Sequence, residues 1–296
     1  MDATSRTLPG PAPRTVHELR ERISSKRCTC EDISKNAKPC KHPHKKVFEV
    51  CNNKARIDRS YDAVELADQV IYFIESAGVE ESRDQVQRIA LQELKDMARF
   101  GWIDGKREVF RRLGWKNGKN SVSPYDMEML IECLNELFFG STLGVLFKWV
   151  EGLRDSDGRE LYGCCSFMED HILIRMDATF FDNIPNIPGK YYGRALSRLG
   201  TLLHEMLHAF FQQYACVDCA RVKLGFGGHG LAWQMAGNKL EKVASQLFNA
   251  PIDLSRFNSY RCDWQHLQEL PCGHWLDAWD WKEDLLRERV EDTETK

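Results

Sequence analysis

The feature that most restricts the fold of this 296-residue chain is a pair of histidines, His204 and His208, inside an apolar stretch. Residues 194–214 carry leucine and phenylalanine at helical spacing and contain no proline, which predicts an α-helix. On a helix the two imidazoles project about 40° apart around the axis, so they can converge on one ion. The stretch therefore predicts a helix with one face in the core and the other lining a cleft.

Glu205 follows the first histidine and completes the pattern H-E-x-x-H. Neutral imidazole suits zinc, and a catalytic zinc site has three protein ligands and an open position for water. Such a zinc ion lowers the pKa of its water toward about 7, and Glu205 can accept the proton and return it to a leaving amine. The pattern therefore predicts Zn²⁺ as cofactor and Glu205 as the catalytic base of peptide hydrolysis, whereas two core histidines are the structural alternative.

His229 is the first candidate for the third ligand, in the run Gly227-Gly228-His229-Gly230 before a second helical pattern. Glycine has no side chain that could keep this loop away from the first helix. A metzincin would need a histidine at position 214, which is Tyr214 here. Glu241, within the second helical pattern, is the alternative third ligand.

Apolar periodicity and glycine or proline breakers indicate an α+β domain with helices before and after a small sheet. Helices are expected over 16–27, 61–77, 84–100, 106–113, 125–139 and 194–214 and after His229, and strands over 145–150, 161–167 and 171–176. The strands could offer an edge to an extended substrate. Of the tyrosines near the motif, Tyr191, Tyr192 and Tyr214, none is assigned as an oxyanion donor, because a structural role is the simpler interpretation.

From residue 125 to 255 the chain resembles the SprT-like zinc metallopeptidase domain, the family that includes Spartan. The resemblance rests on the H-E-x-x-H helix, the Gly228-His229-Gly230 turn, and upstream the run L-N-E-L-F-F-G at 134–140, Trp149, and the runs 163–167 and 172–174. After the turn the family often has proline and an aromatic residue, and here Trp233 can fill that apolar position. The resemblance implies a zincin-like fold with a three-stranded sheet, a protein substrate, and DNA-associated proteins among the candidates.

Two groups of cysteine and histidine lie outside this motif. A second, structural zinc could be held in the basic N-terminal segment, although an unliganded loop is the alternative. Cys216 and Cys219 could pin the loop before His229 or simply pack as thiols. The candidate donors of the second zinc are Cys28, Cys30, Cys40, His42, His44 and Cys51.

Charge is unevenly distributed along the chain. Residues 1–60 contain 14 Lys and Arg against seven Asp and Glu, whereas residues 251–296 contain six against 11. The basic segment could contact DNA, although a solvated, partly disordered arm is the simpler interpretation. The expected organisation is a basic N-terminal segment (1–60), a helical region (61–120), a SprT-like domain (121–255) and an acidic C-terminal tail (256–296).

Composition also bears on compartment and on partners. No apolar run approaches the length of a membrane span, and no secretory signal is evident. Eleven cysteines without such a signal indicate reduced thiols, and hence a nuclear or cytoplasmic protein that is not secreted. A non-catalytic, zinc-stabilised module that binds nucleic acid or protein is the alternative function, and Glu205 argues against it because a structural site needs no base.

Overall fold

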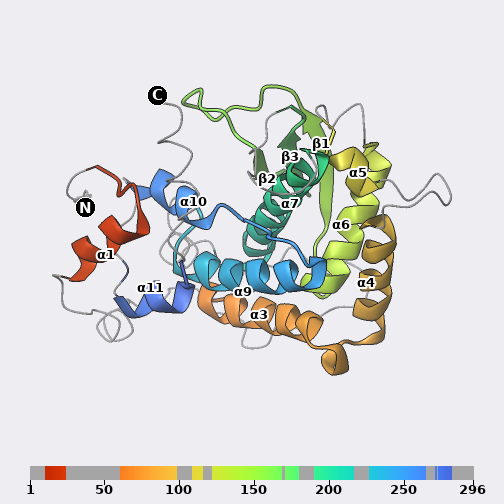
Figure 1. The fold of residues 1–296 in the computed structure, drawn as a ribbon, viewed down its shortest axis with the longest axis horizontal. Helices are drawn as coiled ribbons and strands as arrows, with labels where there is room; N and C mark the ends of the chain where they lie inside the picture. Colours follow the sequence, from red (N-terminus) through yellow and green to blue (C-terminus); the bar gives the residue numbers. More distant parts are fainter. Residues whose placement is uncertain are drawn as a thin grey trace.

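The structure, a computed structural model, describes residues 11–24, 61–98, 109–115, 122–168, 171–179, 190–216, 227–264, 271 and 273–281. Within these ranges the chain is a mixed α+β protein with nine α-helices, one 3-10 turn and a three-stranded sheet (Figure 1). The proposed donors of a second zinc in the N-terminal segment, and Cys219, lie outside the described residues.

The helices before the sheet have clear starting signals. The side chain of Asp62 accepts two backbone N–H groups of the first turn of α3. Ser123 forms a capping box with Asp126, and Pro124 occupies the first position of α6, where a missing N–H removes no helical hydrogen bond. These elements are α3 (Ala63–Gly78), the 3-10 turn η1 (Glu80–Ser82), α4 (Gln85–Ala98), α5 (Val109–Leu113) and α6 (Pro124–Phe138).

The sheet has the strand order β1-β3-β2. β3 runs parallel to β1 and antiparallel to β2, so β2 is an edge strand. Alternate side chains of β3 are buried, as expected for a sheet with one face in the core. The strands are β1 (Val145–Val150), β2 (Gly163–Phe167) and β3 (Ile172–Asp177), each within two residues of the range expected from sequence.

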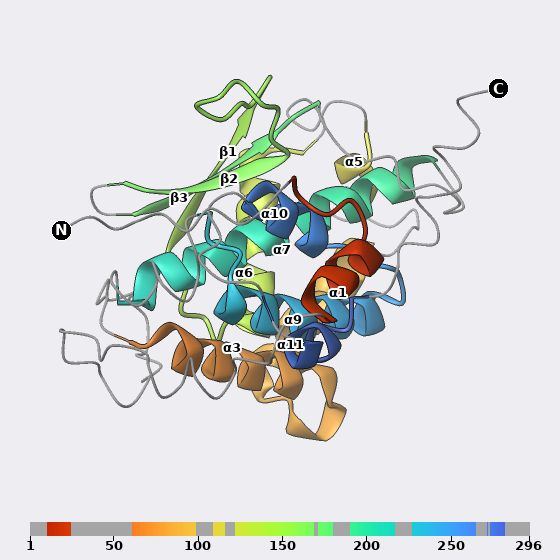
Figure 2. The same cartoon turned by 90° about the vertical axis from the view of Figure 1, so that its left-hand side faces the viewer.

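Below the sheet the helices form successive layers, which Figure 2 shows as α7, then α9, then α3. α7 (Lys190–Tyr214) packs against β2 and β3 on one side and against α9 (Leu231–Phe248) on the other. The leucines of α7 at 196, 199, 203 and 207 are almost completely buried. Each such side chain contributes about 1.5–3 kcal/mol through burial, so the apolar face of α7 holds it between sheet and helix.

One hydrophobic core runs from Tyr61 to Leu254. It includes α3 and α4 as well as the sheet, α7 and α9, so the helical region expected at 61–120 shares its core with the domain expected at 121–255. In the described part of the chain, no helix combines the length and the apolarity that crossing a bilayer requires.

A second, smaller cluster joins the two ends of the described chain. α1 (Val16–Ser24) packs against α11 (Gly273–Trp279), and α10 (Arg256–Cys262) completes the group. Residues 256–264 and 273–281, which the sequence assigned to an acidic tail, are therefore packed helices and their flanking turns. The buried members of this cluster are Leu19, Tyr260, Trp264, Leu276, Trp279 and Trp281.

Candidate metal centre

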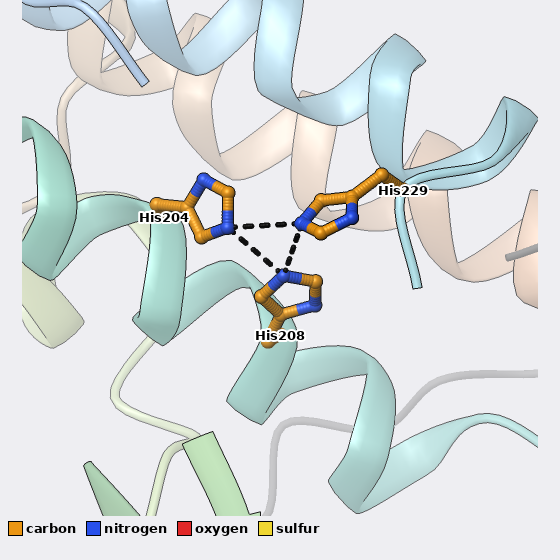
Figure 3. A group of neighbouring side chains, drawn as sticks. All are labelled: His204, His208 and His229. Atoms are coloured by element: carbon orange, nitrogen blue, oxygen red, sulfur yellow. Dashed lines mark hydrogen bonds between the residues drawn. The ribbon is translucent and has the colours of Figure 1, made fainter. Parts of the chain in front are cut away.

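The structure brings together the three histidines that the sequence singled out. His204 and His208 lie one turn apart on α7, and His229 lies at the entry to α9, two residues before Leu231. Figure 3 shows their rings converging from the two helices on one point. They form the one group in the described residues whose donor atoms are close enough to hold a metal ion.

The three Nε2 atoms form an almost equilateral triangle. They are separated by 3.0 Å (His204 to His208), 2.9 Å (His208 to His229) and 3.0 Å (His229 to His204). A tetrahedral zinc ion with Zn–N bonds of about 2.0–2.1 Å would hold its nitrogens about 3.3 Å apart. The triangle is therefore within a few tenths of an ångström of the arrangement that such an ion requires.

The other ring nitrogens decide which tautomers are present. Nδ1 of His204 lies 2.8 Å from the carbonyl oxygen of Leu254, and Nδ1 of His229 lies 2.9 Å from Oδ2 of Asp263. A carbonyl and a carboxylate only accept, so in both rings Nδ1 carries the proton and donates it. The Nε2 lone pairs of these rings then face each other at 3.0 Å, an arrangement that a cation between them stabilises.

Burial keeps the imidazoles of His204 and His208 neutral. Burial, together with the nearby His229, lowers the pKa of His204 to about 3, although its hydrogen bond to Leu254 acts in the opposite direction. Burial and the two neighbouring histidines lower the pKa of His208 well below its usual value. Neutral imidazole is the form that binds a metal ion, so both residues are ready to act as ligands near neutral pH.

Trp233 closes one side of the triangle. Its ring centre lies 4.7, 5.4 and 4.9 Å from those of His204, His208 and His229, and its side chain is fully buried. It is the aromatic residue expected to fill the apolar position after the glycine–histidine turn. An indole on this side keeps water away, so water can reach the histidines only from elsewhere.

Glu205 is directed from α7 toward the edge strand. A Cβ on Gly163 of β2 would lie 3.0 Å from its Oε1, so only glycine lets the strand pass this close. Burial raises the pKa of the Glu205 carboxyl to about 8, while a backbone hydrogen bond from Cys165 acts in the opposite direction. A carboxyl whose pKa lies near neutrality can accept and return a proton. A nearby cation would lower this pKa and so favour the ionised carboxylate.

The remaining candidates lie elsewhere. Glu241, the alternative third ligand, accepts hydrogen bonds from the backbone of Leu254 and from Arg256 and is not among the grouped donors. Tyr214 donates its hydroxyl proton to the carbonyl of Thr142 at 2.6 Å and is buried, which agrees with a structural role. Cys216 is buried. Nothing is described for the side chains of Tyr191 and Tyr192.

Sequence reasoning missed Asp263 and Leu254, whose oxygens accept from His229 and His204. Asp263 lies 34 residues after His229 in a segment assigned to the tail, and no local pattern connects the two. A backbone carbonyl such as that of Leu254 carries no sequence signal at all. The spacing of Tyr260 and Trp264, four residues apart, is the only hint that this segment forms a packed helix.

No family model, curated protein or solved structure matches this chain.

Proposed function

We propose that the chain is a zinc-dependent endopeptidase of the SprT-like type, which hydrolyses peptide bonds in protein substrates. The observation that carries the proposal is the triangle of Nε2 atoms 2.9–3.0 Å apart, with a buried glutamate on the same helix. Three imidazoles without a fourth grouped donor in the described residues suit a catalytic rather than a structural zinc site. The motifs that resemble the SprT-like domain support the same assignment.

His204, His208 and His229 would hold the ion, and Glu205 would move the proton. Bound there, Zn²⁺ supplies Lewis acidity toward a water molecule and a substrate carbonyl. Glu205 accepts a proton from that water and delivers it to the departing amine. Trp233 excludes water from its own side of the centre.

The edge strand β2 supports a peptide as the substrate. Among the described residues β2 pairs with β3 on one side only, and Glu205 lies against its first residue, Gly163. An extended peptide added at the free edge would form backbone hydrogen bonds without any particular side chain. Its peptide bonds would then pass near the glutamate that moves the proton.

Replacing Glu205 with Gln tests the proposal. Gln keeps the shape and can still accept from the backbone of Cys165, but it cannot take up a proton. We expect zinc content near one per chain at this site and casein cleavage reduced by about 10²–10⁴-fold, the usual contribution of a general base. Metal analysis measures the zinc content, and a casein assay measures the cleavage rate. Repeating the casein assay with DNA tests the nucleic-acid contact expected of the basic N-terminal segment.

Glu128→Gln is the matched control, because Glu128 is exposed on α6 and distant in sequence from the motif. This variant should cleave at the wild-type rate, and a chelator should abolish cleavage by both. Undiminished cleavage by pure Glu205→Gln protein would exclude the assigned base. Zinc binding without any cleavage by the wild type would favour the non-catalytic binding module instead.

A further inference from the structure

We propose that residues 252–263, here called the support segment, select the imidazole tautomers of the metal centre, with Asp263 and Glu241 as positioning residues. The proposal rests on the metal site of the proposed function and assigns a role to side chains that would not touch metal or substrate. The support segment follows α9 and includes α10.

The two ends of the support segment hold two different histidines. Near its start, the carbonyl of Leu254 accepts from Nδ1 of His204 at 2.8 Å. At its end, Oδ2 of Asp263 accepts from Nδ1 of His229 at 2.9 Å and lies 3.4 Å from the backbone nitrogen of the same residue. Because both acceptors lack a proton to give, each fixes the tautomer that leaves Nε2 free for a metal ion.

Glu241 sets the position of the first acceptor. Its Oε1 accepts from the backbone nitrogen of Leu254, and its Oε2 accepts from Nε of Arg256, both at 2.8 Å. Arg256 is 5% exposed and also donates to Asn238 on α9 and to the carbonyl of Trp279 on α11. Glu241 thus acts on His204 through the backbone of Leu254.

Glycines let the support segment approach both ligand elements. A Cβ on Gly200 of α7 would overlap the carbonyl oxygen of Asp253, and a Cβ on Gly227 would overlap the carboxylate of Asp263. The first contact is one turn before His204 and the second is two residues before His229. These close approaches hold the segment against the elements that carry the same two histidines.

A histidine that loses its acceptor can carry the ring proton on Nε2 instead of Nδ1. In that tautomer Nε2 has no lone pair for a metal ion. Loss of such a partner usually weakens metal binding about 10–100-fold. The support segment therefore determines how tightly the centre binds its metal, even though it provides no ligand.

Substitution of Asp263 tests this role with two readouts that need no catalysis. We expect Asp263→Ala to weaken zinc binding about 10–100-fold in competition with a chromogenic chelator. Imidazole ¹⁵N NMR of the metal-free protein should show His229 losing its Nδ1–H preference, with the His229 signals assigned from a His229→Gln variant. Asp263→Asn, whose amide oxygen can still accept, should restore the tautomer and part of the affinity.

Asp277→Asn is the matched control, because Asp277 is an exposed carboxylate on α11 that pairs with Arg20, whereas Nδ1 of His204 and Nδ1 of His229 face Leu254 and Asp263. It should bind zinc as the wild type does. Zinc affinity of Asp263→Ala within about threefold of wild type, with His229 unchanged, would overturn the proposal. If Asp263→Ala does not fold, the Asn variant decides: weaker zinc binding supports the proposal, and wild-type affinity overturns it.

The role of the support segment can be contradicted without contradicting the peptidase function, and the reverse also holds. Wild-type protein that binds zinc but cleaves no protein would contradict the proposed function and leave the support segment untouched. Conversely, if the protein is active but its zinc affinity does not change when Asp263 is replaced, only the role of the support segment is contradicted.

Discussion

Gly228 adopts a φ of +89°, and a Cβ on it would lie 3.0 Å from Cε1 of His208. The backbone before His229 therefore has a conformation that L-residues avoid and a neighbour that leaves no space for a side chain. This residue connects a local conformation to the metal centre, because it lets the loop place His229 beside His208.

We expect Gly228→Ala to destabilise the fold by about 1–3 kcal/mol through backbone strain and also to weaken zinc binding. Gly158→Ala is the matched control: Gly158 has a φ of +80°, but a Cβ there would meet nothing within 4 Å. The control should lose stability in urea unfolding yet retain wild-type zinc affinity. Equal zinc affinities for the two variants would show that the close approach of Gly228 to His208 has no effect on zinc binding.

The grouping of the three histidines was predictable because the signal is local in sequence. His204 and His208 are one helical turn apart, and the glycines around His229 indicate a loop that can approach closely. The oxygens of Leu254 and Asp263 were not predictable, since they reach the histidines across 50 and 34 positions. A hydrogen-bond acceptor that tertiary packing brings close to a histidine leaves no periodic pattern in the sequence.

At the scale of elements, Arg198 anchors α7. Its buried guanidinium donates to the carbonyls of Leu113, Trp115 and Ala178, so one side chain joins α7 to the end of α5 and to the residue after β3. Burial lowers the pKa of Arg198 to about 10, which still leaves it charged at neutral pH. It lies six residues before His204, so it also fixes the helix that carries two of the histidines.

Replacing Arg198 with Met should leave three carbonyls without their donor. At about 1 kcal/mol or more for each, the expected loss in free energy of unfolding is about 3 kcal/mol. Urea unfolding of Arg198→Met and of Arg88→Met, a change at an exposed position of α4, measures the difference. A loss no larger than that of the control would mean that water or other donors replace the guanidinium.

The long elements were confirmed within a few residues because their apolar faces repeat at helical or strand spacing. α6 is one example, with its expected range 125–139 against Pro124–Phe138, and β1 at Val145–Val150 is another. The strand order and the parallel pairing of β1 with β3 were not anticipated, since pairing depends on long-range contacts. α10 and α11 were missed because each is only seven residues long.

At the scale of the whole molecule, the proposed metal links α7 to the loop before α9. A ligand that binds only the folded state stabilises it by mass action, and a 100-fold excess over Kd contributes about 2.7 kcal/mol. The centre would therefore act as a cross-link between two layers of the core as well as a site of chemistry.

We expect zinc at a 100-fold excess over Kd to raise the melting temperature of metal-free protein by about 5–10 °C. His229→Gln should lose most of this shift while retaining every cysteine, which controls for zinc bound by thiols. Thermal unfolding followed by circular dichroism, with and without a chelator, measures both. A zinc-dependent shift of equal size in the variant would assign the effect to another site.

Arg20 of α1 pairs with Asp277 of α11 across 257 positions of the chain. During synthesis on the ribosome, α1 is made more than 200 residues before the aromatic residues it packs against. Asp263, the partner of His229, is made 34 residues after that histidine. A nascent chain thus contains H-E-x-x-H during the synthesis of a further 55 residues before Asp263 is added, so orientation of the third imidazole awaits residues that follow α9.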